Sequence, residues 1–379
     1  MKFIVSSSAL LKQLAALNGA LASNPIVPIL ENFLFEIEDE RLRVTASDLQ
    51  ITISSEVVVD ADMSGSIAIP AKMLLETLRN LPEQPVTFKV DLETNGIEIV
   101  SENGRYKLSG ESADDFPKIA SVKEGKTIDL TAECLASAVS YTLFAISGDD
   151  MKPAMNGVYA QFRKDKVLFV STDGHRLVRY NRTDIGSTET TVDTSIIIPK
   201  KALSLLKSTL PSEDTEVKVS FDKSHAFFHF NNVSMICRLI DERFPDYENV
   251  IPLNNSNILI LDRLELLSSL KRMSIYANKF TNQIRLKLKK DDLQISAEDK
   301  DFENEATESL LCEFEGEDME IGFNAKFLIE SLSTLQSRKV KIQMSEPNRA
   351  ALILPTDTDS SEEILMLVMP VMLNNYQYN

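Results

Sequence analysis

The sequence predicts an α+β protein built from three copies of one domain, each with two helices packed on antiparallel sheets. Two observations predict this class. Short sequence markers recur in the same order with a period of about 125 residues, and each period contains both helical and strand-like hydrophobic patterns. The chain has 379 residues, of which 43% are hydrophobic, so each copy can bury a core. We place the copies at residues 1–122, 127–252 and 253–379.

The first markers lie in strand-like segments near the start of each copy. Each segment begins at an asparagine and leads into an alternating stretch that ends at an aspartate. The asparagines are Asn32, Asn156 and Asn282, and the aspartates are Asp48, Asp173 and Asp299. The asparagines and the aspartates independently give the same period, so chance similarity between β-rich segments is a poor explanation of the repeat.

A third marker is a helix in the middle of each copy. The helices are predicted to start at Pro70, Pro199 and Asn324 and to continue to Leu81, Leu210 and Leu335. Proline suits the first helical turn and asparagine is a good N-cap, so different residues mark the same boundary. A second helix is predicted to open each copy, and its leucines are clearest in the first and third copies: Leu10, Leu11, Leu14 and Leu17, then Leu264, Leu267 and Leu270. The last marker is Phe116-Pro117, Phe244-Pro245 and Met369-Pro370.

The net charge of −17 argues against a nucleic-acid partner unless the basic residues lie on one face. The acidic residues crowd predicted strand connections, at 36–40, 114–115, 313–320 and 357–363. The polar stripes of the marker helices are mostly basic, with Lys72, Arg79, Lys200, Lys201, Lys207 and Lys326. Units with open sheet edges can pair until they close into a ring. Helices lining such a ring would present these cations to the phosphates of duplex DNA without reading its sequence.

Several longer motifs resemble one known family. They are Thr172 to Leu177, Arg243 to Tyr247, Met319 to Asn324 and Val368 to Pro370. In order, they closely resemble the β subunit of bacterial DNA polymerase III, the sliding clamps, and the resemblance runs from Met1 to about Leu373. It implies a non-enzymatic processivity factor: a head-to-tail homodimer that closes six domains into a ring around duplex DNA.

The resemblance also implies a peptide pocket between the second and third copies. Partners would be the replicative DNA polymerase, clamp-loader subunits and repair proteins that carry a short apolar motif. The matching residues are Met155, Thr172, Gly174, His175, Arg176, Leu177, Pro245, Val250, Leu367, Val368, Met369, Pro370, Val371 and Met372. Methionine, leucine and valine suit an adaptable apolar cleft, and His175 and Arg176 are expected to supply polar groups.

We also name residues for DNA binding and for the subunit interface. The DNA-binding set adds Lys12, Asn24, Lys152, Lys271 and Arg272 to the helix cations. Asn24 and the 149–152 loop depart from the family pattern, so DNA binding by these two loops has less support than binding by the helices. The subunit interface is expected to bring Tyr106 and Leu108 of one chain against Ile275 and Tyr276 of the next. The six residues after Leu373 extend past the usual family end, and we assign them no role.

Two other readings compete with this one. An enzyme could use Asp173 with His175, or His225 and His229 with Asp222, but neither set has the nucleophile or ligand spacing of a known site. A repeat-built adaptor could use the peptide pocket alone, without DNA. We expect no cofactor and no metal, a cytoplasmic protein with no leader or membrane span, and three inert buried cysteines, Cys134, Cys237 and Cys312.

Overall fold

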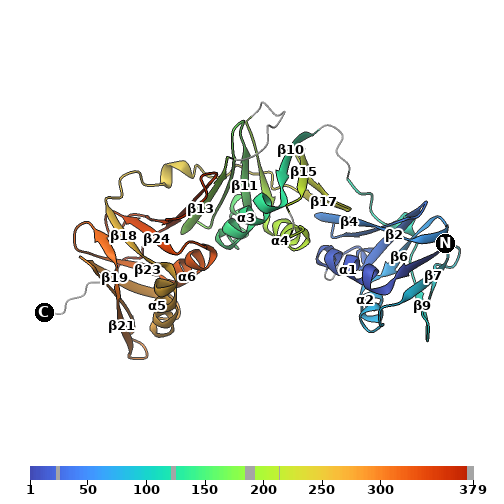
Figure 1. Ribbon diagram of the computed structural model, residues 1–379, viewed down its shortest axis with the longest axis horizontal. Helices are drawn as coiled ribbons and strands as arrows, with labels where there is room; N and C mark the ends of the chain where they lie inside the picture. The colour runs from blue at the N-terminus through green and yellow to red at the C-terminus, as the bar shows by residue number, and fades with distance from the viewer. Residues whose placement is uncertain (23–25, 121–124, 184–192, 213, 374–379) are drawn as a thin grey trace. The chain divides into compact units, whose positions relative to one another are not determined.

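The computed structural model describes residues 1–22, 26–120, 125–183, 193–212 and 214–373 (Figure 1). Within these ranges, no helix combines the length and apolar character needed to cross a membrane. The three copies have the same order of elements: a strand, a helix, a group of strands, the marker helix and a last group of strands.

The elements agree with the predicted repeat. The N-terminal repeat contains β1 (Lys2–Ser6), α1 (Ser7–Leu17), β2 (Asn32–Glu38), β3 (Arg41–Ser47), β4 (Ile51–Val58), β5 (Asp60–Met63), β6 (Gly65–Pro70), α2 (Ala71–Arg79), β7 (Pro85–Asp91), β8 (Gly96–Val100) and β9 (Arg105–Ser109). The central repeat contains β10 (Lys126–Thr131), α3 (Ala132–Thr142), β11 (Gly157–Phe162), β12 (Val167–Thr172), β13 (Arg176–Arg182), β14 (Thr194–Pro199), α4 (Lys200–Thr209), β15 (Glu216–Phe221), β16 (His225–Phe230) and β17 (Val233–Arg238). The C-terminal repeat contains β18 (Asn257–Asp262), α5 (Arg263–Tyr276), β19 (Gln283–Lys289), β20 (Asp292–Asp299), β21 (Asn304–Leu311), β22 (Glu313–Glu315), β23 (Met319–Asn324), α6 (Ala325–Thr334), β24 (Lys339–Met344), β25 (Ala351–Pro355) and β26 (Glu362–Val368).

The chain forms two compact units, and the central repeat is shared between them. The main segments of the first unit are Met1–Ala136 and Lys201–Leu239, and those of the second are Ser137–Ser187, Thr191–Lys200 and Ile240–Asn379. Among the described residues, the first unit has the sheets β5-β1-β7-β8-β9 and β10-β15-β16-β17-β4-β3-β2-β6. The second unit has the sheets β14-β11-β12-β13-β26-β25-β24-β18-β22 and β21-β20-β19-β23.

Each unit contains one joint between successive repeats, and the two joints are of the same kind. In the first, β17 pairs antiparallel with β4, with Met235 opposite Ile53. In the second, β26 pairs antiparallel with β13, with Leu367 opposite Leu177. In both cases the last strand of one repeat adds to the strand that follows the marker aspartate of the preceding repeat.

The helices start and end close to the predicted positions. Asn324 is the N-cap of α6 and its side chain accepts the Lys326 N–H, as expected. Pro70 stands at the cap position of α2, one residue before the first turn in which we expected it. All three marker helices end before their final leucine, and Leu335 is the C-cap of α6. Leu264 is 57% exposed, so it is not part of the buried stripe of α5.

Three aromatic rings pack together in the core of the N-terminal repeat. Phe3 and Phe88 are stacked with ring centroids 4.7 Å apart, and Phe35 lies 6.3 Å from Phe88. All three side chains are fully buried. In the same unit, α1 and α2 lie side by side, as α5 and α6 do in the second unit (Figure 1).

The acidic clusters do not all lie in strand connections, as we had expected. Glu36 and Glu38 belong to β2, and Glu313 and Glu315 belong to β22. They occupy outward positions of these strands, because strand side chains alternate between the two faces of a sheet. Acidic character therefore extends onto the exposed faces of some sheets.

The cysteines are expected to react slowly with thiol reagents in the native protein. Cys134 and Cys237 are buried, whereas Cys312 is only partly buried, which corrects its expected full burial. Burial raises the pKa of Cys237 to about 12 and that of Cys312 to about 11. Because the thiolate is the reactive form, little of either thiol is reactive at a pH of about 8. An aromatic disulfide reagent should label all three cysteines promptly only in denaturant; fast labelling of native Cys312 would contradict this expectation.

Candidate functional site

Side-chain hydrogen bonds fix the turn between β12 and β13, which belongs to the predicted pocket. The Asp173 Oδ1 accepts the N–H groups of His175 and Arg176 at 2.9 and 3.0 Å. The Thr172 hydroxyl accepts the Gly174 N–H at 3.1 Å and donates to the Arg176 carbonyl at 2.7 Å. Gly174 has φ +91°, a left-handed conformation that favours glycine over residues with a Cβ. The marker aspartate therefore has a local role, which is to cap a tight turn.

The end of β26 lies against this turn. Arg176 is opposite Val368 in the β13–β26 pair, and the Met369 N–H donates to the His175 carbonyl at 2.8 Å. Two residues further on, the Val371 N–H donates to the Gly322 carbonyl of β23 at 2.9 Å. The chain segment after β26 thus connects the turn of the central repeat with a strand of the C-terminal repeat.

An apolar cluster underlies the turn and the strand end. Its members are Val170, Leu177, Ile197, Phe244, Tyr247, Ala350, Leu352, Leu365 and Leu367. Tyr159 packs against it and stacks on Phe244 with ring centroids 4.7 Å apart. The Tyr247 hydroxyl donates to Gln161 at 2.7 Å, and burial, with the carboxylate of Glu248 adding to it, raises the pKa of Tyr247 to about 12. This side chain therefore stays neutral and packed at physiological pH.

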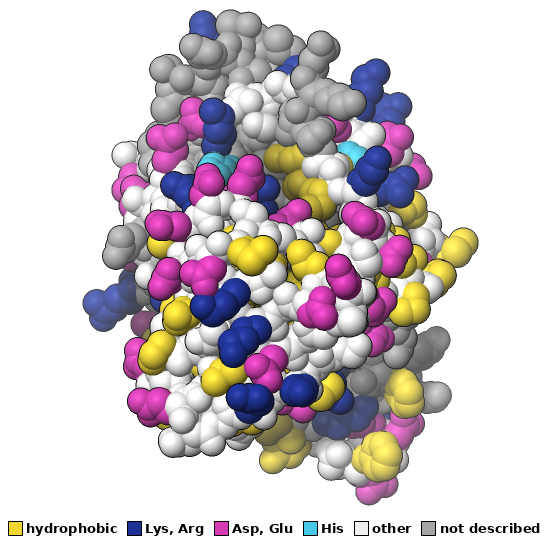
Figure 2. Space-filling view, turned by 90° about the vertical axis from the view of Figure 1, so that its right-hand side faces the viewer, with side chains coloured by type: hydrophobic (Ala, Val, Ile, Leu, Met, Phe, Trp, Pro, Cys, Tyr) yellow, Lys and Arg dark blue, Asp and Glu magenta, His cyan; other side chains and the backbone are white. Residues whose placement is uncertain are grey.

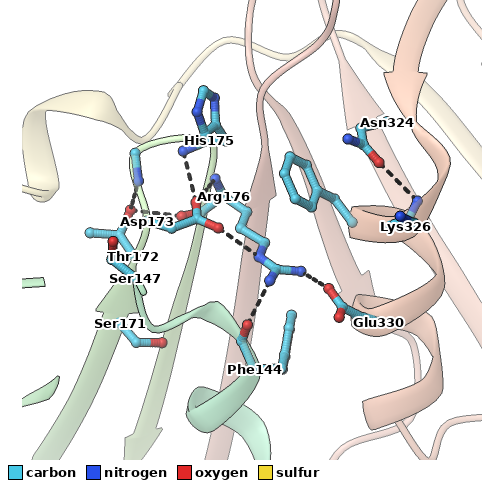
Figure 3. Close-up of polar contacts among 12 residues, drawn as sticks. Phe144, Ser147, Ser171, Thr172, Asp173, His175, Arg176, Asn324, Lys326 and Glu330 are labelled. Carbon is cyan, nitrogen blue, oxygen red and sulfur yellow. Dashed lines mark hydrogen bonds and ion pairs between the residues drawn. The ribbon is translucent and has the colours of Figure 1, made fainter. Parts of the chain in front are cut away.

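Arg176 links the turn to helix α6 (Figure 3). Its Nε donates to Asp173 at 3.1 Å, its Nη2 donates to the Phe144 carbonyl at 2.6 Å, and its Nη1 donates to Glu330 of α6. The guanidinium carbon also lies 5.1 Å from the centre of the Phe144 ring and 4.7 Å from that of Phe327. The Arg176 side chain is only 10% exposed. Charge, hydrogen bonds and aromatic contacts all hold it in one position.

The structure brings most of the predicted pocket residues together. Contacts in the second unit connect Thr172, Gly174, His175, Arg176, Leu177, Leu367, Val368 and Met369. Pro370 and Val371 are partly buried, and Met372 is 73% exposed. Met155, at the end of the short 3-10 helix Pro153–Met155, and Pro245, on a loop, are both partly buried. Val250 is 55% exposed in a second short 3-10 helix, Glu248–Val250. Apolar exposed residues beside a buried apolar floor suit a short peptide.

Sequence reasoning missed several residues of this region. Phe144, Phe327 and Glu330 contact Arg176, and Phe244 and Tyr247 belong to the apolar floor. Phe244 lies in a motif that the sequence had already singled out, so its burial could have been anticipated. Glu330 lies on the polar stripe of the third marker helix, and sequence spacing does not show which strand that stripe faces.

The predicted DNA-binding cations are exposed where the structure describes them, and several have acidic neighbours. Lys201 pairs with Asp48, Arg272 pairs with Glu308 at 2.6 Å, and Lys152 lies 4.0 Å from Asp149. Lys12, Lys72, Arg79, Lys200, Lys207, Lys271 and Lys326 are also exposed. Asn24 lies outside the described residues. Figure 2 shows acidic, basic and hydrophobic side chains interspersed over one face of the molecule.

The predicted interface residues lie on strand β9 and at the end of helix α5. Tyr106 and Leu108 are on β9, the end strand of its sheet, and both are partly buried. Ile275 and Tyr276 end helix α5 and are 62% and 42% exposed. In the same repeat, β21 is the end strand of its sheet.

The residues considered for an enzyme form no comparable site. Asp173 caps the turn, while His225 lies 3.9 Å from Asp222 and His229 contacts Ser234 at 2.9 Å. Within the ranges that the structure describes, no group of three or more histidine, cysteine, aspartate or glutamate side chains could hold a metal ion.

The comparisons with known proteins agree along the whole chain. Three family models of the DNA polymerase III beta subunit match this chain. The N-terminal domain model matches residues 1–120, the central domain model residues 129–246 and the C-terminal domain model residues 248–370. The beta sliding clamp of Vibrio cholerae is 32% identical over 374 residues, covering 98% of this chain and all of that protein. That of Synechocystis is 31% identical and covers 99% of this chain and all of that protein.

Solved structures give the same result. The Pseudomonas aeruginosa sliding clamp bound to griselimycin has a TM-score of 0.93 and 28% identity, covering 98% of this chain and all of that one. The Bacillus subtilis clamp has a TM-score of 0.92 and 25% identity, covering 98% of this chain and 99% of that one. Three clamp domains in one chain define a DNA sliding clamp, a processivity factor of DNA replication. The chain belongs to the DNA polymerase III beta subunit family, the bacterial beta sliding clamps.

Proposed function

We propose that this clamp closes into a ring as a head-to-tail homodimer, encircles duplex DNA and tethers partner proteins through the cleft at the β13–β26 joint. In this proposal the chain is cytoplasmic, catalyses no reaction and needs no cofactor, and its domains are residues 1–122, 127–252 and 253–379. A partner that uses ATP opens the ring.

The observation that carries the ring is the pair of internal joints. Each joins the last strand of one repeat to the strand after the marker aspartate of the preceding repeat. By the same rule, β9 is the last strand of the first repeat and β21 follows the marker aspartate of the third. Both end their sheets, so each can pair with the other from a second chain. A third joint of the same kind then closes the ring and removes both open edges.

The charges on the two edges favour this pairing. The exposed positions of β9 include Arg105 and Lys107, and those of β21 include Glu305. Ile275 and Tyr276 add apolar surface beside β21, and Tyr106 and Leu108 add it on β9. Opposite charge at the rim fixes register and orientation, while apolar contact supplies most of the affinity.

The DNA contact rests on the exposed cations of the helices. Lys207 and Lys326 are exposed on α4 and α6, and Lys72 and Arg79 on α2. The ion pairs of Lys201 and Arg272 reduce what these two residues can offer to phosphate. Sparse, sequence-independent phosphate contacts make the attachment weak and sensitive to salt, which permits sliding.

The partner cleft is proposed to accept short apolar peptides of the replicative polymerase, clamp-loader subunits and repair proteins. Two features support this proposal: Leu177 and Leu367 belong to a buried apolar cluster, and Met369, which follows β26, is partly exposed. A relative of this chain is solved with griselimycin, and we propose that the same ligand binds here. A flexible methionine lets one cleft fit several apolar side chains.

One experiment separates encirclement from surface binding. A clamp loader with ATP loads the protein onto nicked circular DNA, half of the sample is linearised, and gel filtration follows the retained protein. Loss on linearisation supports the ring. Equal retention on both forms would mean ordinary surface binding, and no retention on the circle would favour an adaptor that uses only its cleft.

Reversing one charge at the proposed joint should weaken the dimer, and reversing both should restore it. Lys107→Glu and Glu305→Lys each place like charges at the joint, so each is expected to raise the dimer dissociation constant by about tenfold at low salt. The chain with both changes should recover most of this loss. Sedimentation at several salt concentrations measures the dimer dissociation constant of each variant. Additive weakening in the double variant would show that these two edges do not meet.

A further inference from the structure

Arg176 belongs to the proposed partner cleft, but its polar groups are already engaged within the chain. Each of its three guanidinium nitrogens already donates to an acceptor: Asp173, Glu330 or the Phe144 carbonyl. The rings of Phe144 and Phe327 flank it as well. The guanidinium keeps one further N–H on Nη1 and one on Nη2, but the Arg176 side chain is only 10% exposed, so these groups are poorly accessible to a peptide.

The contacts of Arg176 join two elements that form the cleft. Asp173 also accepts the His175 N–H, and the His175 carbonyl accepts the Met369 N–H at 2.8 Å. The His175 ring stacks on Phe327 with centroids 6.1 Å apart and an interplanar angle of 20°. Phe327 and Glu330 lie one turn apart on α6. The position of α6 is therefore coupled, through Arg176 and Phe327, to His175 and Met369.

We propose that Arg176 is a positioning residue of the partner cleft and that Glu330 acts through it. The carboxylate of Glu330 holds the guanidinium between the two rings, and the guanidinium holds the 173–175 turn against α6. In this arrangement His175 is the polar side chain that remains available to a partner, because it is exposed. This inference rests on the proposed peptide cleft.

The first joint offers a partial parallel. There the turn after β3 contacts the marker helix of the next repeat, through Asp48 and Lys201 of α4. At the second joint Arg176, the first residue of β13 after the corresponding turn, contacts Glu330 of α6. A contact between the region of the marker aspartate and the next marker helix thus recurs at both joints, and the second adds the two aromatic rings.

Glu330→Gln tests the proposal, with Glu363→Gln as its matched control. Both glutamates pair with an arginine of β13 across the same joint, Glu363 with Arg179 at 2.5 Å. Their side chains are similarly exposed, 48% and 54%. The probe is a fluorescein-labelled synthetic peptide with the clamp-binding motif of the replicative polymerase, and fluorescence polarisation measures its affinity for the full-length clamp.

Glu330→Gln is expected to weaken peptide binding about fivefold with little change in the melting temperature, and Glu363→Gln less than about twofold. Arg176→Gln should weaken binding at least as much as Glu330→Gln, and adding Glu330→Gln to it should cause little further loss. Unchanged affinity in Glu330→Gln, or additive losses in the double variant, would overturn the proposal. A loss of affinity that simply follows a fall in melting temperature would also overturn it.

A spectroscopic reading separates positioning from general stability. The chain has three histidines, so the proton NMR signal of the His175 ring can be assigned from its absence in His175→Gln. Glu330→Gln should shift this signal because the Phe327 ring moves relative to it, whereas Glu363→Gln should leave it in place. An unshifted signal in Glu330→Gln would count against the inference. Failure of the unmodified clamp to bind the peptide would instead reject the proposed cleft itself.

Discussion

Replacing Ile275 with lysine is expected to convert the clamp into a monomer that leaves circular DNA as readily as linear DNA. Ile275 is 62% exposed at the end of α5, so the change removes no buried contact of the folded chain. A cation in the last helical turn is favourable for the helix itself. At the proposed joint, however, it would lie near Arg105 and Lys107 and replace apolar contact, which should weaken the dimer at least about a hundredfold. Sedimentation and the retention experiment measure both effects.

Leu264→Lys is the matched control for this prediction. Leu264 lies on the same helix and is 57% exposed, but it belongs to the first turn. The two positions are separated by about 16 Å along the helix axis. The control should remain a dimer and stay on circular DNA. If Ile275→Lys also remains a dimer at low protein concentration, the joint does not involve the end of α5.

Phe88→Ala is expected to lower the free energy of unfolding of the first unit by about 3–5 kcal/mol. Phe88 is fully buried, stacks on Phe3 and contacts Phe35, so the truncation leaves a cavity among rigid rings. Phe88 lies on β7 of the sheet whose end strand is β9, and the change should therefore also weaken the dimer. Denaturant unfolding, with hydrogen exchange as the readout for each unit, would measure the loss in the free energy of unfolding.

Phe280→Ala is the control for Phe88→Ala. Phe280 is 91% exposed, so its truncation should change the free energy of unfolding by less than about 0.5 kcal/mol. The first unit should lose protection in Phe88→Ala while the second keeps it. Equal loss of protection in both units would mean that they unfold as one cooperative body, and a change below about 1 kcal/mol would mean that the three rings contribute less than their burial implies.

The repeat could be predicted from the sequence because its markers have local causes. The N-cap at Asn324 and the turn after Asp173 depend on residues only two or three positions away. The leucines of α2 and α6 form buried stripes because helical spacing places them on one face. Features with local causes can be recognised from the sequence, and their recurrence in three copies makes them easier to recognise.

The contacts at the joints could not be predicted in this way. Arg176 and Glu330 belong to different repeats, as do Asp48 and Lys201. Their pairing depends on which strand edges meet, and hydrophobic periodicity does not specify the partner of an edge strand. The pocket residues were named from a family resemblance, which supplied the neighbourhood but not the contacts of Arg176. The same limit explains why Lys201 and Arg272 were expected to face DNA without their acidic neighbours.

The strand order of the joints has a consequence for the synthesis of the chain. β4 pairs with β17, and β13 pairs with β26, although in each case the partners are about 180 residues apart in sequence. On the ribosome, β4 emerges long before β17 and β13 long before β26, so each waits with one edge uncovered while the rest of its sheet is made. The nascent chain therefore passes through partly completed sheets that can pair with the wrong strand. Chaperones that cover open edges should matter more for its yield than for that of a protein whose neighbouring strands are consecutive.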